Sequence, residues 1–311
     1  MIATETHVTG SGTPPVTLRV REHGPRTGAP HVLLLHGYPD DQTLWDDVVA
    51  ALPRDWHVVT VDNRGAGGST RPPGTAAYAV GELVEDVAAV VAATVPAGEP
   101  VHLVGHDWGA VTGWEVVAAA TWDPRFDQLA SYTAVSGICL DHVRTRAATW
   151  RGRRQLLPQA LHSWYVALFC LPRLPELLWR RGQWLLRRLA RRLDPTSGLL
   201  PWGRGLTSDA VAGLALYRAL ARSPRAAAYW RTSLPVLVVH GRHDGFLTLR
   251  AQEGLEARCR RLVRVALDTG HWVPRSEPDV LARLVQDHVG AAAAPTAAAS
   301  PAPAPARAPR R

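Results

Sequence analysis

The chain lacks lysine altogether and has only three cysteines among its 311 residues. The cysteines, Cys139, Cys170 and Cys259, lie far apart without the paired spacing of a metal site, so we interpret them as reduced thiols. No apolar run approaches the ~20 residues that a membrane-spanning helix needs. Residues 1–10 are polar and show no signal-peptide pattern. These absences favour a cytoplasmic protein without a structural metal.

Short apolar runs recur along the chain and indicate buried strands. They are residues 32–35, 58–61, 101–104, 132–135, 236–239 and 262–266. An alternating segment at residues 16–21 indicates a further strand. Strands that are apolar on both faces belong to a sheet covered on both sides, and helical stretches such as residues 81–94 separate several of them. This alternation predicts an α/β fold with a mostly parallel, doubly wound sheet.

The alternation stops between residues 137 and 225, where the sequence is rich in Arg, Trp and Leu and helical in pattern. We interpret this segment as an inserted helical cap. The chain then divides into a first core part (1–136), the cap (137–225), a second core part (226–290) and a tail (291–311). Because the tail consists mainly of Ala and Pro and has no core-forming residue, we expect it to be disordered.

The segment GHDWGA, residues 105–110, stands between an apolar run and a stretch of helix formers. A nucleophile elbow has one small residue two positions before the nucleophile and another two positions after it. This tight turn presents the central side chain at the end of a sheet. The central residue here is Asp107, whereas serine is usual. Taken alone, this aspartate could equally be a helix cap.

Two further candidate groups, Asp244 and His271, each follow one of the last two apolar runs. Because catalytic groups of open α/β sheets gather at the carboxyl ends of strands, we expect them to meet Asp107. The order nucleophile, acid, histidine along the chain is that of the α/β-hydrolase triad. Asp141 follows another strand end and is the alternative acid. A lone histidine is more often structural, but the ordered set favours catalysis.

A carboxylate nucleophile suits attack on saturated carbon. Serine would form an ether there, whereas Asp107 would form an ester that water can hydrolyse. His271 would act as the general base of this hydrolysis, oriented by Asp244. The backbone amides of Tyr38 and Trp108 are the candidate donors to the oxyanion. The sequence therefore predicts displacement at an alkyl carbon, of an epoxide oxygen or of a halide.

Four motifs at these positions resemble the branch of the α/β-hydrolase superfamily that contains epoxide hydrolases and haloalkane dehalogenases. They are HGYP at residues 36–39, GHDWG at 105–109, HGRHD at 240–244 and GHWVPRSEP at 270–278. The resemblance extends from about residue 16 to residue 290. It implies an α/β-hydrolase fold, with a mostly parallel central sheet flanked by helices and an inserted helical cap, and a reaction without cofactor or metal.

Two segments of the cap distinguish members of this branch. SWYVALF and LYR look like the epoxide-hydrolase segments whose tyrosines, here Tyr165 and Tyr217, donate hydrogen bonds to the epoxide oxygen. A phenol stays protonated at neutral pH and can therefore meet the developing alkoxide. A dehalogenase instead binds halide with N–H groups from the position of Trp108 and often from an Asn after His-Gly, where this chain has Tyr38.

The resemblance thus favours hydrolysis of a small hydrophobic epoxide, since the Leu- and Trp-rich cap suggests an apolar access route. Lipid-derived epoxides are one such class. Alternatives are a haloalkane dehalogenase, with Trp150 or Trp164 binding the halide, another hydrolase, or a non-catalytic binding protein on the same fold. The chain is also similar to the hydrolase half of bacterial fusions with a short-chain dehydrogenase. It shows no dinucleotide fingerprint, and residues 63–69 lack phosphate-loop spacing, so we expect neither a nucleotide cofactor nor oxidoreductase activity.

Positive charge concentrates in the predicted cap. Residues 144–192 contain twelve arginines and one acid, Glu176, within a chain of net charge +8. If residues 174–193 form one helix, most leucines fall on one side and most arginines on the other. Such a helix could lie on an anionic membrane. The alternative, which we favour, is a helix that covers the active site behind a solvated basic rim. No nucleic-acid-binding motif accompanies the charge, so we expect no nucleic-acid partner.

Overall fold

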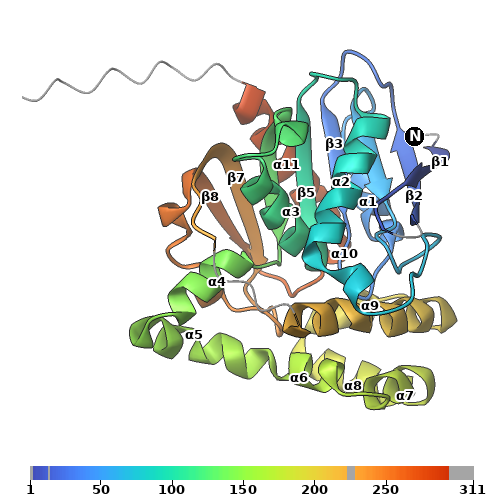
Figure 1. Ribbon diagram of the computed structural model, residues 1–311, viewed down its shortest axis with the longest axis vertical. Helices are drawn as coiled ribbons and strands as arrows, with labels where there is room; N and C mark the ends of the chain where they lie inside the picture. Colours follow the sequence, from blue (N-terminus) through green and yellow to red (C-terminus); the bar gives the residue numbers. More distant parts are fainter. Residues whose placement is uncertain (1–2, 13–14, 223–227, 294–311) are drawn as a thin grey trace, which may run out of the picture.

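The computed structural model of the chain describes residues 3–12, 15–222 and 228–293. An eight-stranded sheet runs through this part in the order β1-β2-β4-β3-β5-β6-β7-β8 (Figure 1). The strands are β1 (Ala3–Thr9), β2 (Thr17–His23), β3 (His31–Leu35), β4 (His57–Val61), β5 (Val101–His106), β6 (Leu129–Val135), β7 (Thr232–Gly241) and β8 (Cys259–Leu267). The pairs β1–β2 and β2–β4 are antiparallel, and the other pairs are parallel. The predicted mostly parallel sheet is confirmed.

All seven apolar or alternating segments lie in strands, whereas β1 was not predicted. Its sequence is polar, and Val8 is its one buried residue. As the edge strand, β1 pairs only with β2 and contributes little to the core. A polar edge strand such as β1 therefore leaves no buried-strand pattern in the sequence. The opposite edge strand, β8, was found from its apolar run, but the prediction that it is buried is wrong, since Val263 is 54% exposed.

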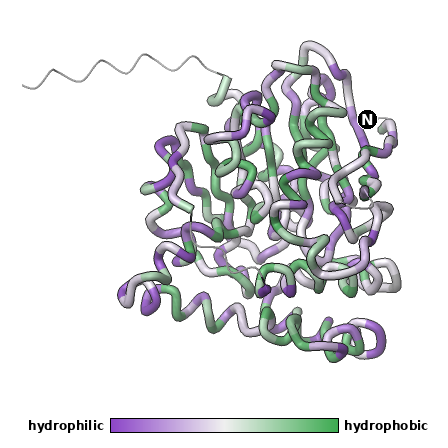
Figure 2. The backbone as a smooth tube through the Cα atoms, viewed as in Figure 1, coloured by the Kyte–Doolittle hydropathy of each residue, from purple (hydrophilic) through white to green (hydrophobic). Residues whose placement is uncertain are grey.

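Helices cover both faces of the sheet, as expected. They include α1 (Asp46–Ala51), α2 (Val80–Thr94), α3 (Trp108–Ala119) and α11 (Pro278–Ala293). In β3, Leu33 and Leu35 belong to the core cluster that α2 and α3 share. Val32 and Leu34 belong to the opposite cluster, which α1 and α11 share. Successive side chains of a strand point to opposite faces, so a doubly covered strand must be apolar throughout. Figure 2 shows this concentration of apolar residues in the sheet.

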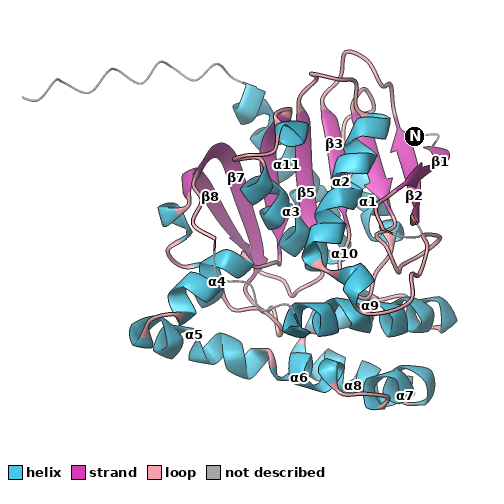
Figure 3. Ribbon diagram, viewed as in Figure 1, coloured by secondary structure: helices cyan, strands magenta, loops and turns pink. Residues whose placement is uncertain are grey.

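Between β6 and β7, the described residues form six α-helices, which make a layer at one end of the sheet (Figures 1 and 3). They are α4 (Leu140–Ala147), α5 (Trp150–His162), α6 (Trp164–Cys170), α7 (Leu174–Arg181), α8 (Gln183–Leu193) and α9 (Arg204–Arg222). The described residues from 137 to 222 contain no strand. The helical character of the insertion agrees with its pattern, while the division into domains stays a prediction.

The interpretation of residues 174–193 as one helix is wrong, because α7 ends before Gly182 and α8 begins after it. Gly182 has φ −108° and ψ 20°, and its carbonyl accepts the amide of Leu185, which starts the new helix. Glycine is a poor helix former and is common where helices end. The amphipathic pattern is therefore shared between two helices rather than continuous.

At the carboxyl end of the chain, α11 extends to Ala293, so residues 291–293 of the predicted tail are the last turn of a helix. The remainder of the tail lies outside the described residues. In the part of the chain that the structure describes, no helix is both long and apolar enough to cross a membrane.

Candidate active site

Asp107 occupies a sharp turn between β5 and α3, with φ 50° and ψ −115°. A non-glycine residue at positive φ is strained and needs support from its surroundings. Two glycines allow this turn to pack tightly. A Cβ atom at Gly105 would lie 2.4 Å from the Gly109 carbonyl oxygen, and one at Gly109 would lie 2.1 Å from that of Leu35. The turn has the geometry expected of a nucleophile elbow.

Both candidate oxyanion donors lie at the Asp107 carboxylate. The Tyr38 amide donates a 2.8 Å hydrogen bond to Oδ2. Burial raises the pKa of Asp107 to about 6, while the charge of His271 and hydrogen bonds from the Tyr38 and Trp108 amides act in the opposite direction. The loop after β3 can approach this closely because Gly37 has no side chain, and a Cβ there would lie 2.4 Å from Asp107 Cβ. Oδ2 is thereby held by the Tyr38 amide, and Oδ1 is the oxygen that faces His271.

His271, in the turn after β8, meets both carboxylates that the sequence assigned to it, Asp107 and Asp244. Its Nδ1 lies 2.8 Å from Asp244 Oδ2, and its Nε2 lies 3.7 Å from Asp107 Oδ1. Burial lowers the pKa of His271, but the charges of Asp244 and Asp107 and the Asp244 hydrogen bond prevail and raise it to about 9. The imidazole is therefore a cation between two anions in the resting site at neutral pH.

Asp244 is held in place by its own loop. Its Oδ1 accepts the backbone amides of Phe246, at 2.8 Å, and Leu247, at 2.9 Å. Burial raises the pKa of Asp244, but His271 and these amides outweigh it, so the pKa is lowered. The alternative acid, Asp141, lies elsewhere and accepts a 3.1 Å hydrogen bond from the Trp230 indole. Only Asp244 of these two acids contacts His271 in the described structure.

The two predicted cap tyrosines come together above Asp107. Tyr165 lies on α6 and Tyr217 on α9, their ring centroids are 6.2 Å apart, and both line one cavity with Asp107 and His271. Burial raises the pKa of each phenol well above its usual value. A hydrogen bond from the Trp108 side chain acts against this rise at Tyr217. Both phenols are protonated donors at neutral pH.

The rest of the cavity is apolar. Its walls include Leu168, Phe169, Trp179, Leu186, Leu189 and Phe246. Trp164 also lines it, whereas Trp150 is 63% exposed. Among the described residues no cluster of His, Cys, Asp or Glu is arranged to hold a metal ion. The site is an apolar chamber with a carboxylate and an imidazole at the carboxyl ends of the strands and two phenols on helices α6 and α9.

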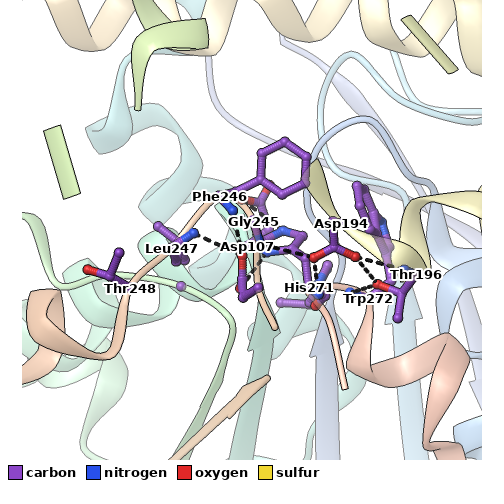
Figure 4. A network of polar contacts seen from close by, with 12 residues as sticks. Asp107, Asp194, Thr196, Gly245, Phe246, Leu247, Thr248, His271 and Trp272 are labelled. Carbon is purple, nitrogen blue, oxygen red and sulfur yellow. Dashed lines mark hydrogen bonds and ion pairs between the residues drawn. The ribbon is translucent and has the colours of Figure 1, made fainter. Parts of the chain in front are cut away.

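Sequence reasoning missed Asp194, which directly follows α8 (Figure 4). Its carboxylate is fully buried and accepts the backbone amides of His271, at 2.7 Å, and Gly245, at 3.1 Å. Its other oxygen accepts the amide and hydroxyl of Thr196. The sequence signal was Asp-Pro-Thr, which is typical of a helix cap, and nothing in it indicates contact with the histidine turn.

The sequence model of the alpha/beta hydrolase fold family matches residues 30–278. The chain belongs to this family, in agreement with its sheet, its elbow and the order of the residues around Asp107.

Two relatives and one solved structure illustrate the similarity. The probable oxidoreductase EphD of Mycobacterium tuberculosis is 32% identical over 286 residues, 87% of this chain and 47% of that protein. Epoxide hydrolase A of the same organism is 41% identical over 100 residues, 32% of this chain and 30% of that protein. The chain thus spans about half the length of the first relative. The structure of an epoxide hydrolase from Bacillus megaterium with an inhibitor has a TM-score of 0.73 and 21% identity, covering 92% of this chain and all of that one.

Proposed function

We propose that this chain hydrolyses a hydrophobic epoxide to a vicinal diol through an ester on Asp107. The observation that carries the proposal is the pairing of two phenols, the half-buried Tyr165 and the buried Tyr217, with an anionic carboxylate across an apolar cavity. A nucleophile on one side and two proton donors on the other match the needs of ring opening. The similarity to Epoxide hydrolase A and to the epoxide hydrolase from Bacillus megaterium supports the same activity.

In the first step, Asp107 Oδ1 attacks an epoxide carbon, and the C–O bond of the ring breaks. Tyr165 and Tyr217 donate hydrogen bonds to the leaving oxygen, and one phenol gives it a proton. The ester has lost the charge of Asp107, so the pKa of His271 falls, because that charge had helped to raise it. The imidazolium can then return a proton to the phenolate, which leaves His271 neutral and ready to act as a base.

In the second step, His271 takes a proton from water, which adds to the carbonyl carbon of the ester. The oxyanion forms on Oδ2, where the Tyr38 amide already donates a hydrogen bond. Collapse of this intermediate breaks the bond to the alkyl oxygen, which takes the second proton of the water. The products are the diol, the Asp107 carboxylate and protonated His271, so epoxide and water are consumed in equal number.

The experiment that tests this route is turnover in ¹⁸O-labelled water. We expect one labelled oxygen to enter the Asp107 carboxyl group in the first cycle, and the diol to acquire label only in later cycles. Asp107→Ala should abolish diol formation. Label that enters the diol in a single turnover, and never Asp107, would contradict an ester intermediate.

Haloalkane dehalogenation is the second candidate, because it also uses a carboxylate nucleophile. A halide ion would need N–H donors, but residue 38, where a dehalogenase often has asparagine, is a tyrosine that lines the cavity. Epoxide hydrolysis is therefore the better match. Release of halide from haloalkanes, with no diol from a panel of terminal and internal epoxides, would reverse this order.

The sequence alone favoured a solvated basic rim, but a groove beside α8 supports the membrane interpretation. We further propose that the arginine-rich surface of the cap contacts anionic membrane lipid and admits a lipid-derived epoxide. A groove beside α8 is lined by Trp184, Trp202 and four arginines, Arg187, Arg188, Arg191 and Arg192. Trp202 also lines the apolar cavity, so the groove adjoins the substrate chamber. Trp184 is 69% exposed, as expected of a side chain that enters a bilayer interface. Each basic residue near an anionic surface contributes roughly 1 kcal/mol.

Vesicle sedimentation tests this contact. We expect binding to vesicles that contain phosphatidylglycerol, weaker binding in high salt, and little binding to phosphatidylcholine alone. Arg187→Gln with Arg191→Gln should weaken binding, whereas the control pair Arg54→Gln with Arg260→Gln, which are exposed elsewhere, should not. Binding that ignores both salt and lipid charge would contradict the proposal.

A further inference from the structure

Asp194 is a buried carboxylate whose two oxygens are fully engaged. Oδ2 accepts the backbone amides of His271 and Gly245, and Oδ1 accepts the amide and hydroxyl of Thr196, at 2.8 and 2.5 Å. The Thr196 hydroxyl oxygen also accepts the amide of Trp272, at 3.0 Å. Figure 4 shows these bonds converging on the turn that carries His271. Hydrogen bonds to a charged acceptor are stronger than those between neutral groups.

The two loops that Asp194 contacts are those of the proposed acid and base. Gly245 follows Asp244, and Gly270 precedes His271. A Cβ atom at Gly270 would lie 2.3 Å from Asp194 Oδ1, and one at Gly245 would lie 2.0 Å from the Leu193 carbonyl oxygen. Both loops therefore pack in direct contact with residues 193–194, at the end of α8. Glycine is required at both places because only backbone without a side chain fits against this segment.

Helix α8 also forms part of the substrate chamber. Leu186, Leu189, Ala190 and Leu193 line the cavity from one side of this helix. Asp194 comes one residue after the helix ends, and its amide donates to the Ala190 carbonyl. One carboxylate consequently joins the helix that covers the substrate to the backbone of the two loops beneath it.

We propose that Asp194 is a positioning residue of the reaction, which holds the His271 and Asp244 loops in register with Asp107 and couples them to α8. This inference rests on the proposed function. Misplacing a catalytic group by about 1 Å can cost on the order of 10²-fold in rate. Asp194 therefore acts through His271 and does not touch the substrate.

The charge of Asp194 supports the same role. Three carboxylates face His271, namely Asp107, Asp244 and Asp194, and each favours the imidazolium. Two histidines, His106 and His240, also lie within electrostatic reach of His271. Removing the Asp194 charge should make the imidazolium less stable, so that His271 loses its proton at a lower pH. A purely structural link between cap and core would not have this effect.

The test is Asp194→Asn, which keeps the size of the side chain but removes its charge and replaces one acceptor oxygen with an NH₂ group. We expect kcat to fall about 10- to 100-fold with little change in KM, and the acid limb of the kcat profile to move to lower pH. The matched control is Asp209→Asn. Asp209 is another buried carboxylate of the insertion; it bonds Arg71 of the core and is not among the carboxylates that raise the pKa of His271. It should leave the pH profile unchanged.

A readout without turnover separates this inference from the proposed function. NMR titration of the His271 imidazole should show a lower midpoint in Asp194→Asn than in wild type and in Asp209→Asn. If wild type forms no diol but this midpoint moves, the proposed activity fails and the role of Asp194 stands. If wild type forms diol while Asp194→Asn changes neither kcat nor the midpoint, Asp194 has no positioning role.

Should Asp194→Asn not fold, Thr196→Val provides the second variant. It keeps the Asp194 charge but removes the hydroxyl that donates to Asp194 and accepts from Trp272. We expect a several-fold loss in kcat and no shift of the His271 midpoint. An unchanged kcat in this variant would overturn the proposal.

Discussion

Replacing His271 with glutamine should separate the two halves of the proposed reaction. Attack on the epoxide needs the Asp107 carboxylate and the phenols of Tyr165 and Tyr217, none of which is removed. Hydrolysis of the ester needs a base at Nε2, which lies 3.7 Å from Asp107 Oδ1. Glutamine has no basic group at neutral pH. The ester should therefore form and then persist.

The expected loss in the rate of ester hydrolysis follows from the contribution of general-base catalysis. That contribution is about 10²–10⁴ in rate, or roughly 3–5 kcal/mol in activation free energy. Loss of the imidazolium beside Asp107 changes the first step as well, because this cation helps to keep the carboxylate ionised. Without this cation the pKa of Asp107 should lie above its wild-type value of about 6, so the assay is run at about pH 9 to keep the carboxylate ionised. The deficit should therefore fall on the second step.

Intact-protein mass spectrometry measures the outcome. After mixing with styrene oxide and an acid quench, His271→Gln should gain the full mass of one epoxide, and peptide mapping should place it on Asp107. His243→Gln is the matched control, since His243 lies next to Asp244 but its side chain is 61% exposed. It should turn over normally and accumulate no adduct. Steady-state loss without an adduct, or an adduct on another residue, would refute the two-step reasoning.

Three other predictions concern the same groups. Tyr165→Phe and Tyr217→Phe should each lower the rate of adduct formation by at least tenfold, since each removes one donor to the epoxide oxygen, and the double variant should form no adduct in rapid-quench experiments. Asp244→Asn should reduce kcat by about 10⁴-fold, as loss of the orienting acid does in a related triad, whereas Asp141→Asn should retain kcat within about threefold. For stability, the raised pKa of His271 favours the folded state below its ordinary value of 6.5, and this contribution is lost as pH rises towards about 9. Urea unfolding should thus show wild type losing stability relative to His271→Gln between pH 6.5 and 9, and parallel curves would contradict this.

The sheet and the centre of the site could be predicted because their signals are local. A strand covered on both faces must be apolar throughout, and β3 and β4 are buried along their whole length. The carboxyl ends of parallel strands then meet without further information. Asp107 and His271 could be placed together for this reason alone, although their separation in the sequence is large.

The choice of acid could not be settled in the same way. Asp141 and Asp244 both follow strand ends, so position along the chain does not distinguish them. The difference lies in what surrounds each carboxylate after folding. Asp141 is the first-turn acid of α4 and bonds the Trp230 indole, whereas the Asp244 loop turns its carboxylate towards His271.

Asp194 was beyond sequence reasoning for a more general reason. Its segment follows a helix whose sequence predicts only that it covers the active site. Its contacts with the two loops are with backbone amides, which carry no residue-specific signal. The clue is the absence of side chains at Gly245 and Gly270, which is interpretable only once the segment that fills that space is known. The insertion thus supplies both phenols and, through Asp194, a support for the base. If this is correct, a chain that carries the insertion of a relative should lose activity unless that insertion has an acid at the position of Asp194. Gly245 and Gly270 of the core loops must also be present.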